Sequence, residues 1–96
     1  MTEEDAKDYA KSLTDVQRDV LLLCSTGRSF GYRRLAELTG LEYVEVLGAG
    51  HFLQSANLAF VETVRLGNEF NGSAIFLNGR GERVRLAATR LRRRKK

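Results

Sequence analysis

The chain has 96 residues, with 16 Lys and Arg against 12 Asp and Glu, which gives a formal net charge of +4. This length accommodates one domain with a modest core and excludes a deep substrate cavity walled by two lobes. The longest apolar run, residues 20–24, is too short for a membrane span, and the acidic N-terminus lacks the basic start of a secretory signal. We therefore expect a cytoplasmic protein with no segment that spans a membrane.

The first quarter of the chain is predicted to form two helices. Residues 3–12 have a thin apolar stripe at helical spacing, and their N-terminal end is acidic. Residues 14–25 form a stronger helix, because Thr14 and Gln17 have the spacing of a capping box, and Gly27 is expected to end it.

Two further helices are predicted on either side of a glycine. The first covers residues 30–39 and ends at Gly40, and the second covers residues 42–57 and closes at Asn57. The inward-facing positions predicted for these helices are Leu35, Ala36, Leu38, Val46, Gly50 and Leu53.

After these helices, apolar residues recur at every second position, which is the period of a β-strand. Residues 60–65 and 73–77 alternate and are β-branched, so we expect a hairpin with a loop of about five to seven residues over 67–72. Phe60 and Phe76 are predicted to lie in the core. Asn78 then caps a last helix, whose apolar stripe is Val84, Ala87, Ala88 and Leu91.

Positive charge is concentrated in the second half of the chain. Residues 1–48 hold six basic and nine acidic side chains, whereas residues 49–96 hold ten basic and three acidic ones. A basic tail of this density attracts polyanions. Three interpretations of the tail stay open: a nucleic-acid contact, a solvated tail that aids solubility, and a contact with an acidic protein or membrane surface.

The order helix, helix, tight turn, helix, hairpin, helix is that of a winged helix-turn-helix. We therefore expect a mostly helical α+β fold with a three-helix core, a two-stranded β-wing and an extra helix at each end. The predicted organisation is an acidic helical extension (1–12), the winged-helix domain (13–89) and the basic tail (90–96).

Several apolar and turn positions along residues 13–82 carry a family resemblance. They are Leu13-Thr14-x-x-Gln17-x-x-Val20-Leu21, Leu35-Ala36-x-x-x-Gly40-Leu41, Val46, Leu53, Leu58 and Leu77-Asn78-x-x-Gly81. In this order and separation, they resemble the winged-helix domains of MarR-type bacterial and archaeal regulators. The resemblance implies that the second helix of the helix-turn-helix enters the DNA major groove. It also implies that the wing reaches the minor groove or backbone and that the terminal helices form a homodimer.

The resemblance also implies a set of residues that contact double-stranded DNA. On the recognition helix these are Tyr43, Val44, Leu47, Gly48 and His51. The preceding helix and the wing contribute Arg33, Arg34 and Arg65. Separately from the resemblance, the charge of the basic tail predicts phosphate contacts by Arg90, Arg92, Arg93, Arg94, Lys95 and Lys96.

The recognition helix departs from the pattern usual for a DNA reader. It has no Lys or Arg, and Glu42 and Glu45 stand at its start. It also contains two internal glycines, each of which costs about 0.8–1 kcal/mol relative to Ala. Gly50 falls on the inward line, so a crowded core explains it, whereas Gly48 faces outward, where either a close contact or no contact fits. The wing tip lacks an arginine.

Signals of an enzyme, a metal site or a cofactor are absent from the sequence. One cysteine, Cys24, and one histidine, His51, provide neither a zinc ligand set nor a paired nucleophile and base. Gly79-Arg80-Gly81 follows a strand but lacks the remaining glycine and the lysine of a phosphate loop. We expect no catalytic residue, no metal and no cofactor.

Three functions therefore stay open. The first is a small DNA-binding transcriptional regulator, which the element order and the basic tail favour. The second is a winged-helix module that binds a protein partner through the acidic, glycine-containing helix. The third is RNA binding, which the tail does not distinguish from DNA binding.

Overall fold

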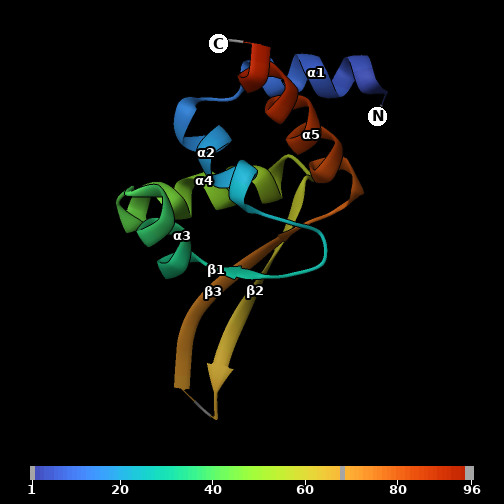
Figure 1. The fold of residues 1–96 in the computed structure, drawn as a ribbon. Helices are drawn as coiled ribbons and strands as arrows, with labels where there is room; N and C mark the ends of the chain where they lie inside the picture. The colour runs from blue at the N-terminus through green and yellow to red at the C-terminus, as the bar shows by residue number, and fades with distance from the viewer. Residues whose placement is uncertain (1, 68, 95–96) are drawn as a thin grey trace.

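The computed structural model describes residues 2–67 and 69–94, apart from the side chains at 64, 66, 69–71 and 92–94. Helices and a small sheet are arranged in one body, with the wing projecting from one end (Figure 1). The elements in chain order are α1 (Glu3–Ser12), α2 (Asp15–Leu23), β1 (Phe30–Gly31), α3 (Tyr32–Thr39), α4 (Tyr43–Ser55), β2 (Ala59–Leu66), β3 (Glu69–Leu77) and α5 (Gly79–Arg94).

The capping box predicted for α2 is present. The Gln17 N–H donates to Thr14 Oγ1 at 3.2 Å, and the Thr14 N–H donates to Gln17 Oε1 at 3.0 Å. The predicted end at residue 25 is wrong, because Cys24 has extended backbone and α2 ends at Leu23. The carbonyl of Ser25 accepts a hydrogen bond from the Leu77 N–H at 2.8 Å. This contact with the end of β3 holds the chain in a non-helical path before Gly27.

The turn between α3 and α4 is built as predicted, with Gly40 in the left-handed region at φ 75°. The predicted start of the first helix at residue 30 is wrong. Phe30 and Gly31 pair with Ile75 and Ala74 as a two-residue strand, and α3 begins only after it.

The predicted limits of the second helix, residues 42–57, are also too wide. Glu42 is the N-cap of α4 rather than its first residue, and Ala56 is its C-cap. Asn57 follows with a positive φ of 60°, which is where the helical path is broken.

The sheet is antiparallel in the order β1-β3-β2, so the two-stranded wing gains a short third strand at its base. The predicted loop over residues 67–72 is too long, because β3 already starts at Glu69, which pairs with Leu66. The turn dipeptide Asn71-Gly72 instead lies at a register shift opposite the stretch from Thr63 to Arg65. Gly72 has φ 99° there, a conformation that favours glycine in a β-bulge.

The core lies between the helices and the inner face of the sheet. Its largest fully buried side chains are Leu21, Leu35, Leu53, Leu58, Ile75, Leu77, Val20, Val46 and Val84. Two predictions of core residues are wrong, because Leu38 is 47% exposed and Phe60 is 53% exposed. Tyr32, which the pattern did not assign to the core, is buried under α4.

The terminal helices α1 and α5 pack against each other at the end of the molecule opposite the wing tip (Figure 1). Small residues, Ala6 and Ala10 on α1 and Ala88 on α5, are buried there. The predicted cap of α5 is present, since the Gly81 N–H donates to Asn78 Oδ1 at 2.8 Å. Among the described residues, no helix is long and apolar enough to span a bilayer.

Candidate nucleic-acid interface

One face of α4 is open along its first three turns. Val44 is 71% exposed and Leu47 is 38% exposed, and Gly48 and His51 are exposed beside them. These positions share a helix face because they are spaced three and four residues apart. The opposite face is buried through Val46, Ala49, Gly50 and Leu53. The structure therefore brings together four of the recognition-helix residues predicted from the sequence.

The acid at the start of α4 has a local structural role. Glu45 Oε1 accepts the backbone N–H of Glu42 at 3.1 Å. A carboxylate in the first turn of a helix also interacts favourably with the positive end of the helix dipole. This capping hydrogen bond therefore explains why an acidic residue, Glu45, stands at the start of a helix whose exposed face is mostly apolar.

The two internal glycines of α4 have different surroundings. A Cβ built at Gly50 would collide with Tyr32 Oη and lie 2.6 Å from Tyr32 Cζ, so the glycine lets α3 and α4 approach closely. The crowded core predicted at Gly50 is confirmed. At Gly48, nothing described lies within 4 Å of such a Cβ. No contact among the described residues therefore explains Gly48, and its exposed position leaves room for an approaching molecule.

A hollow of about 260 Å³ lies where α3, α4 and the wing meet. Three predicted site residues line it, Arg33 and Arg34 from α3 and Tyr43 from α4. The sequence analysis missed Tyr32, Gly72 and Ser73, which complete the lining together with Gly31. The pairing of β1 with β3 places the wing beside α3, and no local pattern in the sequence signals that contact.

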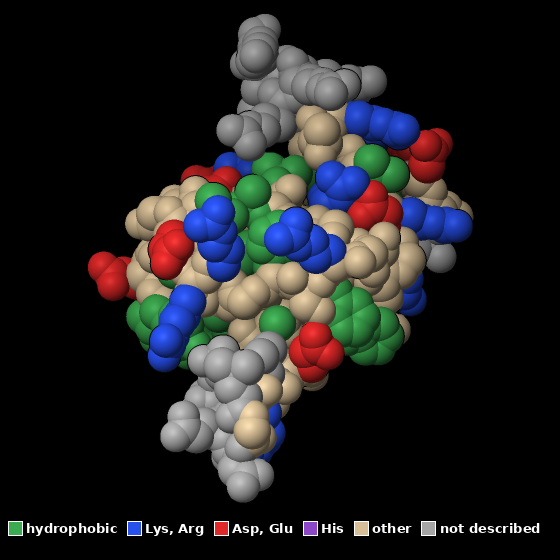
Figure 2. Space-filling model, turned by 60° about the horizontal axis from the view of Figure 1, so that its bottom comes forward, with side chains coloured by type: hydrophobic (Ala, Val, Ile, Leu, Met, Phe, Trp, Pro, Cys, Tyr) green, Lys and Arg blue, Asp and Glu red, His purple; other side chains and the backbone are tan. Residues whose placement is uncertain are grey.

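The charges around this hollow are accessible. Arg34 forms an exposed ion pair with Glu37 at 3.3 Å, one turn along α3. Arg33 is also exposed, and no carboxylate of the described residues pairs with it. Arg65 is exposed on β2 of the wing, opposite Phe70 in the ladder. Figure 2 shows Lys and Arg side chains, and some Asp and Glu side chains, interspersed with hydrophobic ones over one face of the molecule.

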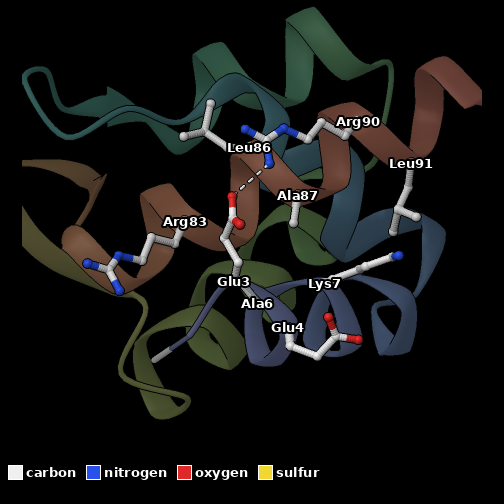
Figure 3. A pocket seen from close by; sticks show the side chains of 9 residues that line it. All are labelled: Glu3, Glu4, Ala6, Lys7, Arg83, Leu86, Ala87, Arg90 and Leu91. Carbon is white, nitrogen blue, oxygen red and sulfur yellow. Dashed lines mark hydrogen bonds and ion pairs between the residues drawn. The ribbon is translucent and has the colours of Figure 1, made fainter.

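The predicted tail contacts lie at the other end of the chain. Arg90 is on α5 and forms an ion pair with Glu3 of α1 at 3.1 Å (Figure 3). The helix α5 continues to Arg94, past the predicted boundary at residue 90. The side chains of Arg92, Arg93 and Arg94, and all of Lys95 and Lys96, lie outside the described residues.

The pair Glu3–Arg90 closes one side of a second hollow, of about 280 Å³, between α1 and α5 (Figure 3). Its walls combine apolar groups, Ala6, Leu86, Ala87 and Leu91, with charged ones at the rim. Leu86 is 44% exposed there. The terminal helices therefore keep apolar surface uncovered in the single chain.

The two residues considered for chemistry are placed differently. Cys24 is buried, its Sγ–H donates to the Val20 carbonyl at 3.2 Å, and burial raises the pKa of its thiol to about 12. His51 is exposed on α4. Across residues 2–67 and 69–94, no group of three His, Cys, Asp or Glu side chains is arranged to hold a metal ion.

The exposed Phe60 pairs across the ladder with Phe76, and the ring centroids are 5.2 Å apart. Two aromatic rings on adjacent strands are a feature that can stack with bases. However, Glu62, two residues along the same strand, accepts a hydrogen bond from Ser29 Oγ at 2.7 Å and places a carboxylate nearby. A negative charge beside the pair disfavours a polyanion there.

No family sequence profile and no curated protein sequence matches the chain. Solved structures of regulators do match it closely in shape. A MarR family transcription regulator superposes with a TM-score of 0.71 at 18% identity, over 97% of this chain and 60% of its own. The transcriptional regulator SlyA gives 0.73 at 17% identity, over 96% and 65%. PcaV from Streptomyces coelicolor gives 0.70 at 22% identity, over 88% and 60%.

The chain has the winged-helix fold of MarR-type regulators. The likeness includes the terminal helices, so it extends beyond the residues 13–82 that carry the resemblance in sequence. The predicted fold class is confirmed. The chain spans about three fifths of the length of the regulators it matches.

Proposed function

We propose that this chain is a transcriptional regulator that binds duplex DNA through α4. The observation that carries the proposal is the open face of α4 in a helix-turn-helix, with Arg33 and Arg34 beside its N-terminal end. In this geometry the second helix enters the major groove while the first crosses the backbone. The similar solved structures are described as transcription regulators, which supports the proposal.

The residues divide into two roles. Arg33, Arg34 and Arg65 contact phosphates and position the protein, whereas Val44, Leu47 and His51 face the bases. Tyr43 lies between the two sets, in the hollow that Arg33 and Arg34 line. Phosphate contacts supply affinity that depends on salt and carries no sequence information.

We further propose a homodimer held by α1 and α5. The uncovered apolar surface around Leu86, in the hollow between α1 and α5, supports this arrangement. A Leu86→Glu variant is expected to become monomeric in sedimentation-velocity measurements. Val44→Glu places the same charge on α4 and is the matched control, which stays dimeric. A Leu86→Glu protein that keeps the mass of the parent protein contradicts the dimer interface.

The basic tail is proposed to add phosphate contacts outside the segment that α4 covers. This follows from its position, since α5 ends beside α1, at the opposite end from the wing (Figure 1). A truncation after Thr89 is a poor test, because it also removes Leu91, which packs against the core. Replacing the five basic residues at 92–96 by glutamine removes the charge and keeps the helix.

The test is fluorescence anisotropy with random duplex DNA at about 50 and 200 mM salt. The parent protein is expected to bind with a steep salt dependence. For each bound chain, if five tail charges contact phosphate, the glutamine variant flattens the slope of log K against log salt by about 4.5. A doubly substituted Arg33→Gln, Arg34→Gln protein is expected to flatten it by about 2 for each bound chain, and a dimer with both chains on the DNA doubles both values. A parent protein that binds no duplex at low salt refutes the function.

A protein partner is the second candidate, because the open face of α4 is apolar and has no cation. Such a contact would tolerate salt, whereas phosphate contacts would not. Duplex binding at low salt that weakens as salt rises therefore favours the DNA-binding regulator over the protein-binding module. The measurement needs only the purified chain and DNA.

A further inference from the structure

The side chains that α4 offers to a major groove are unusual in kind. Arginine and lysine recognise guanine, and asparagine and glutamine recognise adenine, through hydrogen bonds to the base edges. At the N-terminal end of α4 the exposed face instead holds Val44 and Leu47, which have no polar atoms in their side chains. Among the four bases, thymine alone presents an apolar group in the major groove, its C5-methyl.

We propose that Val44 and Leu47 select thymine-containing sites by packing against the C5-methyl groups of thymine. This inference rests on the proposed DNA-binding function and names the sequence class that the site reads. It predicts that base discrimination comes from apolar contact at two positions, one helical turn apart on α4.

The position of the two residues in the fold supports the proposal. Base contacts of a helix-turn-helix come from the N-terminal residues of the recognition helix. Val44 is the second residue of α4, and Leu47 lies one turn further on the same face. Gly48 follows, and apart from its chain neighbours and the nearby backbone of α4, no described atom lies within 4 Å of where a Cβ would stand. The lack of a side chain there lets the helix backbone come close to the groove floor.

Charge complementarity favours DNA over an apolar protein surface as the occupant. Tyr43, the residue before Val44, lines the same hollow as Arg33 and Arg34, and that hollow reaches the wing at Gly72 and Ser73. Cations at the border of an apolar strip match a groove whose floor holds methyl groups and whose walls are phosphates. The carboxylate of Glu45 interacts with the backbone of Glu42 within the helix cap.

The experiment removes only the methyl group. A preferred duplex is selected from random sequence with the full chain, and each thymine is then replaced in turn by deoxyuridine. Deoxyuridine keeps the base-pairing edge and lacks the methyl. At the positions that face Val44 and Leu47, binding is expected to weaken about four-fold for each methyl.

Variants assign each effect to a residue. In Val44→Ala, the penalty for deoxyuridine is expected to vanish at one position and remain at the others. Leu38→Ala is the matched control, because Leu38 is an exposed leucine on the neighbouring helix and its variant keeps every penalty. Val44 is largely exposed, so its truncation leaves the fold intact, which circular dichroism checks.

The outcomes distinguish a preference for thymine from duplex binding itself. Penalties that disappear with Val44→Ala or Leu47→Ala support the proposal. Tight duplex binding that is equal for thymine and deoxyuridine at every position overturns this inference and leaves the proposed function standing. A chain that binds no duplex at low salt overturns both, and the apolar strip would then belong to a protein contact.

Discussion

Two glycines on α4 provide a matched pair of substitutions. Gly48→Ala and Gly50→Ala lie two residues apart in the same helix, and each gains about 0.8–1 kcal/mol of helix propensity. At Gly48 the new methyl meets no described atom within 4 Å, so the whole gain is expected to appear as stability. For a domain of this size, that gain raises Tm by about 4–8 °C.

At Gly50 the same methyl would collide with the ring of Tyr32, 2.6 Å from Cζ. Tyr32 is 3% exposed, so a shift of its ring would disturb the buried contacts around it. Overpacking of this kind costs about 1–3 kcal/mol, which cancels or exceeds the propensity gain. The difference between the two variants therefore isolates the contact between α3 and α4, and it is expected to be about 1–3 kcal/mol in favour of Gly48→Ala.

Urea unfolding followed by circular dichroism, at one fixed protein concentration, measures this difference. Adding Tyr32→Leu to each variant completes the comparison. The smaller side chain is expected to reduce the gap between Gly48→Ala and Gly50→Ala, because the colliding ring is gone. If the two alanine variants agree in stability within about 0.5 kcal/mol, the close approach of α3 and α4 at Gly50 is not as described.

Three further predictions concern stability. Gly81→Ala is expected to lower the free energy of unfolding, measured in urea, by about 1–3 kcal/mol. The reason is that the new Cβ would lie 3.0 Å from the backbone carbonyl carbon of Leu58. Gly79→Ala is the control, because its Cβ would meet nothing described within 4 Å. Thr14→Ala is expected to lower thermal stability by about 1 kcal/mol through loss of the α2 cap, and an unchanged Tm would contradict that role. Burial raises the pKa of Cys24 from 9.0 to about 12, so above pH 9 the unfolded chain loses this proton before the folded one does, and stability is expected to fall as pH rises toward 12. A urea midpoint that stays constant between pH 8 and 10.5, or a native thiol that reacts with Ellman's reagent as fast as an unfolded one, would refute this.

Local signals in the sequence predicted the helices and the turn well. The Thr14–Gln17 capping box and the Gly40 turn depend on residues within four positions of each other, so a short stretch of sequence is enough to predict them. The buried face of α4 could also be predicted, because its apolar residues recur with the period of a helix. Together these features are enough to identify the winged helix-turn-helix order.

Features that depend on distant partners could not be predicted in the same way. Phe30 and Gly31 form a strand only because Ile75 and Ala74 stand opposite, more than forty residues away. Asn71-Gly72 has the composition of a turn, yet it sits in a bulge inside β3. The exposure of Leu38 and Phe60 likewise depends on which surfaces the other elements leave uncovered, which no periodicity reports.

The candidate site likewise combines a part that local sequence predicts with a part that depends on distant residues. The open face of α4 could be predicted from spacing alone, but the hollow that joins Arg33 and Arg34 to Gly72 and Ser73 needs the three-strand sheet. The last described turn of α5, which leads into the basic tail, lies at the opposite end of the molecule from the wing (Figure 1). Under the proposed function, a salt slope measured on the full chain would therefore sum phosphate contacts from both ends, whereas a deoxyuridine penalty would depend only on α4. In the proposed mode of binding, affinity and base selection thus have separate structural sources, and substitutions on α4 or in the tail are expected to remove one without the other.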